Sequence, residues 1–173
     1  MLIIRLSKTA IVASIALFAT LVSWENIIYP SINFAFVHHV FLMDTVFPDA
    51  PTRSRAIDNE TIQWLGYAAI VLCETLTAIL CWIGAIMMLS KIKRSKAEFQ
   101  LAKRVAIAGL TLGFLVWQVA FASIGGEWFG MWMSKQWNGV PDATRFFLTI
   151  LGVLIYVVMP EYEVTEKGSD PAR

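Results

Sequence analysis

One carboxylate lies inside a long apolar segment of this sequence. Residues 61–89 carry a single charged side chain, Glu74, about 20 Å along a helix from the first of these residues. A carboxyl group at such a depth in hydrocarbon is costly, so it indicates a proton relay, a cation site or a hydrogen bond to a ligand. The alternative is a protonated glutamic acid that joins two helices by a hydrogen bond. Its candidate partners are polar residues of other apolar segments: Ser14, Thr20, Thr111 and Gln118.

A second group of chemically capable side chains contains a histidine, a methionine and an aspartate. His39 and Met43 are four residues apart, which would place them on one face of a helix, and Asp44 follows. Imidazole and thioether groups are ligands of soft copper sites, so His39 and Met43 are candidate metal ligands. With Glu25 and Glu127, the histidine and aspartate could instead hold a quinone or a haem. The plainer interpretation is an interfacial segment with one wet side.

Residues 123–139 combine three tryptophans, two methionines and Glu127 with a Gly-Gly pair. An aromatic belt at the membrane interface would explain Trp128 and Trp132 by their depth alone. The glycines also indicate a defined backbone shape, so we expect a folded, Trp-rich outer loop that covers the helix ends. A rigid aromatic surface of this kind suits docking to a larger membrane protein.

Apolar helices must position these groups. Of the 173 residues, 57% are hydrophobic and 16% charged, and the mean hydropathy is +0.63. A soluble domain carries about 25% charged residues, so the composition favours lipid. The sequence predicts an all-α membrane protein with one transmembrane domain at residues 1–160. Four segments are long enough to cross a bilayer core of about 30 Å: residues 9–28, 61–89, 105–124 and 143–159.

Two further segments complete the prediction. Residues 31–46 are apolar but too short to span, which indicates a short interfacial or re-entrant helix after the first span. Residues 161–173 are polar, and we expect a disordered cytoplasmic tail.

The distribution of basic residues predicts the orientation. The N-terminus, the connection at residues 90–104 and the C-terminal tail hold ten of the fourteen Lys and Arg residues. Positive charge marks the cytoplasmic side, so we expect both termini inside and both elaborate connections outside. The outer connections carry the other four: Arg53, Arg55, Lys135 and Arg145.

Several function classes find no support in the sequence. Nucleic-acid binding would need a basic stripe with interleaved aromatic residues, which does not occur outside the 90–104 connection. No Ser/His/Asp arrangement and no phosphate-binding loop is present, so we lean towards a protein that is not an enzyme. No particular cofactor is predicted.

The segments Asn33-Phe-Ala-Phe-Val-His-His-Val-Phe-Leu-Met-Asp-Thr45 and Gly125-Gly-Glu-Trp-Phe-Gly-Met-Trp132, with Trp137-Asn-Gly139, resemble an uncharacterised bacterial family. Its members are predicted small integral membrane proteins, a domain of unknown function. The resemblance implies a four-helix, multi-pass protein of the bacterial inner membrane, and it brings no activity, cofactor or substrate. It also implies that six residues belong to the family's pattern: Asn33, His39, Asp44, Glu127, Trp128 and Trp132.

These observations leave three hypotheses in order. The first is an accessory or interaction subunit of a larger membrane complex, or a homo-oligomer in the bilayer. The second is an outer-leaflet site for quinone, haem or copper. The third is a small proton- or cation-coupled transporter or channel that uses Glu74.

Overall fold

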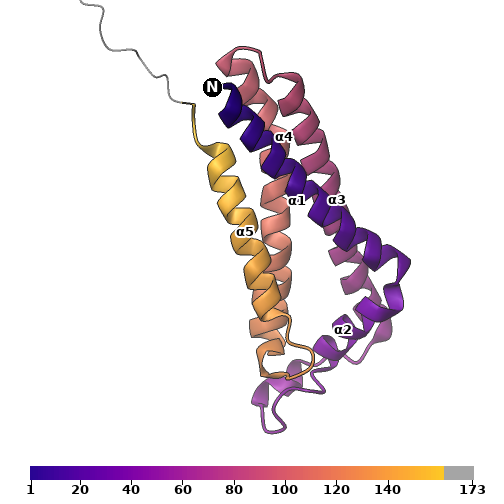
Figure 1. Ribbon diagram of the computed structural model, residues 1–173. Helices are drawn as coiled ribbons and strands as arrows, with labels where there is room; N and C mark the ends of the chain where they lie inside the picture. Colours follow the sequence, from indigo (N-terminus) through magenta and orange to yellow (C-terminus); the bar gives the residue numbers. More distant parts are fainter. Residues whose placement is uncertain (162–173) are drawn as a thin grey trace, which may run out of the picture.

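The computed structural model describes residues 1–161 of the 173, and this part of the chain is helical without a strand (Figure 1). Four helices are long and apolar enough to cross a membrane. The prediction of an all-α protein with four membrane-spanning helices is thereby confirmed. These helices are α1 (Leu2–Ile28), α3 (Glu60–Ser90), α4 (Lys96–Leu115) with its π-helical continuation η2 (Val116–Trp128), and α5 (Val140–Val158).

Shorter elements gather at one end of the bundle. They are α2 (Pro30–Leu42) and the two 3₁₀ turns η1 (Pro51–Arg55) and η3 (Met131–Met133). We call residues 29–59 and 129–139 the cap. The N-terminus, the α3–α4 connection and the end of α5 lie together at the opposite end of the bundle (Figure 1). We call that end, with residues 1–8, 91–104 and 157–161, the basic end.

The third spanning helix is longer than the predicted 105–124. It starts at Lys96, where the Ser95 side chain and Glu98 form a reciprocal capping box. It continues past residue 124 because the backbone changes to π-helical spacing, in which the Phe129 N–H donates to the Ile124 carbonyl five residues earlier, at 3.0 Å. The Trp-rich connection to α5 therefore begins only after Trp128.

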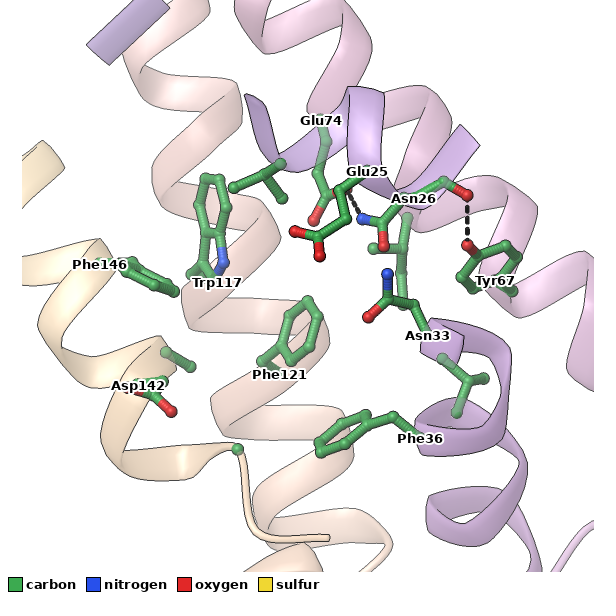
Figure 2. A pocket seen from close by; sticks show the side chains of 15 residues that line it. Glu25, Asn26, Asn33, Phe36, Tyr67, Glu74, Trp117, Phe121, Asp142 and Phe146 are labelled. Carbon is green, nitrogen blue, oxygen red and sulfur yellow. Dashed lines mark hydrogen bonds between the residues drawn. The ribbon is translucent and has the colours of Figure 1, made fainter. Parts of the chain in front are cut away.

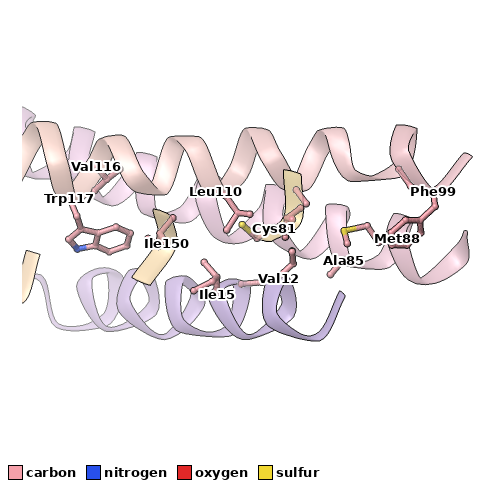
Figure 3. Close-up of a cluster of buried hydrophobic side chains, with 14 of the residues drawn as sticks. Val12, Ile15, Cys81, Ala85, Met88, Phe99, Leu110, Val116, Trp117 and Ile150 are labelled. Carbon is pink, nitrogen blue, oxygen red and sulfur yellow. The ribbon is translucent and has the colours of Figure 1, made fainter. Parts of the chain in front are cut away.

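Close packing of α3 against α4 depends on small residues. A Cβ added to Gly84 would lie 2.4 Å from the backbone nitrogen of Ala106, so the two helices touch backbone to backbone there. Around this contact, buried apolar side chains of all four spanning helices fill the middle of the bundle (Figure 3). Val12, Cys81, Leu110 and Ile150 are among them.

Three buried cations hold the end of α5 at the basic end. The amino groups of Lys8 and Lys103, each 1% exposed, donate to the carbonyls of residues 157 and 159. The last carbonyls of a helix lack partners and carry partial negative charge, so cations stabilise them. Arg5 donates two hydrogen bonds to the Glu161 carboxylate, at 2.7 and 2.8 Å.

Two predictions about this end were wrong for particular residues. Lys103 was assigned to an exposed basic connection, but it lies inside α4 and is buried. Glu161 was assigned to the disordered tail, yet it is 4% exposed and paired with Arg5. Residues 162–173, the remainder of the predicted tail, lie outside the described residues.

Candidate functional site

A cavity of about 260 Å³ lies beneath the cap, between α1, α2, α3, η2 and α5 (Figure 2). We call it the polar chamber. Carboxylates and amides line it on one side and aromatic rings on the other. Its polar lining residues are Glu25, Asn26, Asn33, Glu74 and Asp142.

Glu74 lies deep in the polar chamber. Its side chain belongs to α3, and the residue is 2% exposed. Asn26 of α1 donates a hydrogen bond from Nδ2 to Oε2 of Glu74, at 2.7 Å. The other carboxylate oxygen, Oε1, accepts no hydrogen bond from residues 1–161. Tyr67 fixes Asn26 in place, since its hydroxyl donates to the Asn26 carbonyl at 2.7 Å.

The predicted partners of Glu74 were therefore wrong. Thr20 bonds to the Ala16 carbonyl and Ser14 to that of Ile11, and Gln118 contacts Ser123 at 3.5 Å, away from the polar chamber. The reason is that α1 ends two residues after Asn26, whereas α3 extends about 20 Å further towards the cap. Glu74 is deep when measured along α3 but level with the last turns of α1.

Two further carboxylates stand at the opening of the polar chamber. Glu25 is exposed, and its carboxylate points into the chamber (Figure 2) and makes no hydrogen bond to residues 1–161. Asp142, in the first turn of α5, lies 3.1 Å from the guanidinium of Arg145, and both side chains are about two-thirds exposed. The negative charge of Glu25 is therefore available to the chamber, while that of Asp142 is shared with a cation.

Aromatic rings close the polar chamber towards the basic end. Trp117 of η2 packs against Phe18 of α1 and Phe146 of α5, with ring centroids 5.5 and 5.7 Å apart, and the two phenylalanines are 4.8 Å apart. Phe36 and Phe121 complete the aromatic wall. Ring faces carry partial negative charge, so this wall and the carboxylates both attract cations.

His39 and Asp44 form a contact of their own in the cap. The Nδ1 of His39 lies 2.7 Å from Oδ2 of Asp44, and the imidazole stacks on Trp137 at 4.5 Å. Met43 is 1% exposed and packs in the cap's apolar core. It follows the end of α2 in a left-handed conformation (φ 50°), so the helical spacing that predicted a shared face with His39 does not apply. Residues 1–161 contain no group of three His, Cys, Asp or Glu side chains placed to hold a metal ion.

The remaining predicted residues lie on the surface of the cap. Trp128 is 54% exposed, and the guanidinium of Arg55 lies 4.5 Å from its ring centre. Trp132 is 49% exposed and meets Phe47 edge-on at 5.9 Å, and Glu127 is also exposed. Of the predicted ligand-binding residues, the structure brings only Glu25 and Asn33 together, and it adds Glu74 from the predicted intramembrane pair.

Sequence reasoning did not find four residues that shape the polar chamber. Asn26 and Tyr67 hold Glu74 and the end of α1, Trp117 forms the wall, and Asp142 stands at the opening. One signal was available: Asn26 directly follows Glu25 at the end of an apolar span, where two consecutive polar residues mark an interface. Asp142 carried only a helix-start signal after Pro141, and Trp117 did not differ from other apolar residues.

Comparison with known proteins supports the resemblance seen in the two motifs. Residues 4–160 match the family model described as "Predicted small integral membrane protein (DUF2165)". No curated protein and no solved structure matches the chain. The matched region contains nearly the whole of all four apolar helices and both motifs, as expected for a protein of the lipid bilayer. The chain belongs to this family of predicted small integral membrane proteins.

Proposed function

We propose that this protein is a membrane-embedded binding protein whose polar chamber receives the positively charged group of a ligand. One observation carries the proposal. The Glu25 carboxylate and the Oε1 atom of Glu74 face a cavity with an aromatic wall and accept no hydrogen bond from residues 1–161. Carboxylates together with ring faces recognise cations, and an organic cation uses both.

Binding is better supported than passage of a cation across the membrane. The rings of Phe18, Trp117 and Phe146 lie between the polar chamber and the packed middle of the bundle. At the far end, three buried cations would repel a cation that came through. The transporter hypothesis therefore ranks below the binding hypothesis.

The side of the membrane that the polar chamber faces is part of the proposal. Ten of the fourteen Lys and Arg residues fall at the basic end or in the C-terminal segment, which favours both termini inside and the cap outside. We place the protein in a bacterial inner membrane on the strength of the family resemblance. Reporter fusions after Arg94 and after Lys135 test the orientation, because the reporters should fall in different compartments.

A small ammonium compound tests the binding function directly. Ethanolamine hydrochloride should raise the Tm of the detergent-solubilised protein saturably, since a ligand that binds only the folded state at a hundred times its Kd adds about 2.7 kcal/mol. Equal concentrations of KCl control for ionic strength. Glu25→Gln should lose most of the effect, whereas Glu127→Gln, an exposed glutamate outside the polar chamber, should keep it. An equal response of both variants would contradict the proposal.

The surface of the cap favours a second candidate, an accessory subunit of a larger complex. Trp128 and Trp132 are each about half exposed, and Arg55 and Phe47 hold them in place. Half-exposed tryptophans held in this way are typical of docking surfaces. Gentle purification followed by mass spectrometry should then recover a stoichiometric partner that a Trp128→Ala/Trp132→Ala variant loses. Repeated recovery of the chain alone would count against this candidate.

A further inference from the structure

A second hollow adjoins the polar chamber along the cleft between α1 and α5. It is a groove of about 320 Å³, and it shares Phe146 with the chamber. On α1 its lining residues precede those of the chamber, and on α5 they follow them, so the groove lies one step closer to the basic end. We call it the lateral groove; its lining residues are Ser14, Ile15, Phe18, Arg145, Phe146, Thr149 and Ile150.

Three kinds of chemistry follow one another along this cleft. The polar chamber offers the carboxylates of Glu25 and Glu74. Next comes Arg145, whose guanidinium lies 4.9 Å from the ring centre of Phe146 and pairs only with the exposed Asp142. An exposed ion pair of this kind is weak, so a phosphate can replace Asp142 as the partner of Arg145. Beyond Arg145 the lateral groove is mainly apolar, with Ile15, Phe18 and Ile150.

We infer that the polar chamber and the lateral groove together bind one phospholipid of the surrounding leaflet whose head group carries a primary ammonium. This inference rests on the proposed function and names the ligand. The ammonium lies in the chamber, the phosphate at Arg145 and an acyl chain in the groove. The order of the three groups in such a lipid is the order of the three environments along the cleft.

Two observations favour this lipid over other ligands. A free amine would leave Arg145 and the lateral groove unused, although both adjoin the chamber through Phe146. A trimethylammonium group donates no hydrogen bond, whereas a primary ammonium donates three. Glu25 and the Oε1 atom of Glu74 are the free acceptors for those bonds. The groove lies between two membrane-spanning helices, so lipid from the bilayer reaches it directly.

Native mass spectrometry of the full chain in mild detergent tests the inference. The protein is titrated with dioleoyl phosphatidylethanolamine, and with dioleoyl phosphatidylcholine and dioleoyl phosphatidylglycerol as controls with the same acyl chains. The ethanolamine lipid should half-saturate the protein at about a tenfold lower concentration than the controls, since a charge-assisted hydrogen bond contributes enough for that factor. Glu25→Gln and Glu74→Gln should each abolish this preference, and Glu127→Gln should retain it.

Arg145→Gln separates the lipid from a free amine. This variant should weaken all three phospholipids by a similar factor and leave the Tm increase with ethanolamine hydrochloride unchanged. Glu25 is exposed, so Glu25→Gln keeps the test available even where Glu74→Gln disturbs folding.

The remaining outcomes distinguish the two proposals. Equal binding of the three lipids, with a Tm increase by ethanolamine that depends on Glu25, would overturn the lipid inference and leave the binding function standing. A preference for the ethanolamine lipid that survives both glutamate substitutions would overturn the site. The absence of any lipid preference and of any response to ethanolamine would overturn both.

Discussion

Removal of one carboxylate at the basic end should destabilise the whole bundle. Arg5 donates two hydrogen bonds to Glu161, and the paired side chains are 8% and 1% exposed. The Glu161→Gln substitution keeps the size of this side chain but removes its charge. Arg5, Lys8 and Lys103 would then remain buried, and Arg5 has no other carboxylate within ion-pair distance in residues 1–161.

The expected magnitude follows from the burial of the pair. Breaking a buried ion pair by removing one partner costs about 3–5 kcal/mol, because the remaining charge is left uncompensated. A matched control is Glu98→Gln, since Glu98 faces Lys91 at 3.7 Å with both side chains about 45% exposed. Such an exposed pair contributes about 0–1 kcal/mol. Glutamine at this position also preserves the capping box with Ser95, so the control changes only charge.

Thermal unfolding in one detergent compares the two variants. For a chain of this size each kcal/mol shifts the Tm by about 2–4 °C, so Glu161→Gln should lower it by on the order of 10 °C and Glu98→Gln by a few degrees at most. A double-mutant cycle with Arg5→Met should give a coupling energy above about 2 kcal/mol. Equal Tm values for Glu161→Gln and Glu98→Gln would refute the reasoning that the buried pair holds this end together.

Three further predictions concern single positions. Hydrogen bonds from Arg5 hold the pKa of Glu161 below its usual value of about 4.3; the stabilisation is present above that pH and lost as the pH falls through the lowered pKa, so acid should lower the Tm of the wild type more than that of Glu161→Gln. Gly84→Ala should cost about 1–3 kcal/mol because its Cβ meets the Ala106 backbone, whereas Gly152→Ala, with nothing within 4 Å, should be neutral or stabilising by up to about 1 kcal/mol in thermal unfolding. Tyr67→Phe should cost about 1 kcal/mol of unfolding free energy, since it removes the hydrogen bond to the Asn26 carbonyl; an unchanged Tm would contradict that role.

The sequence predicts the four spanning helices because apolar length is a property of each segment alone. Their ends depend on contacts that hydropathy does not contain. Lys103 reads as part of a polar connection, but the carbonyls of Val157 and Met159 stabilise its amino group inside α4. Likewise, Glu161 reads as part of a polar tail, and only the position of Arg5 from the other end of the chain explains its burial.

The candidate site was predictable in its chemistry but not in its assembly. Glu25, Asn33 and Glu74 each stand out in the sequence as polar groups near or within an apolar run. That they share one cavity depends on how far α3 extends beyond α1, which no local pattern encodes. The His39–Met43 pairing assumed a continuous helix, and the end of α2 at Leu42 removed that basis.

The helix α5 connects the two ends of the molecule. Its first turn supplies Asp142 to the opening of the polar chamber, and Lys8 and Lys103 bind its last carbonyls. Lys8 belongs to α1, so at the basic end the two helices that border the lateral groove are joined by buried hydrogen bonds. Towards the cap these helices diverge (Figure 1), and the rings of Phe18 and Phe146 meet before the polar chamber begins. The cleft can therefore admit a ligand at the cap end without loss of the contacts that hold α1 and α5 together, because those contacts lie at the other end of the bundle.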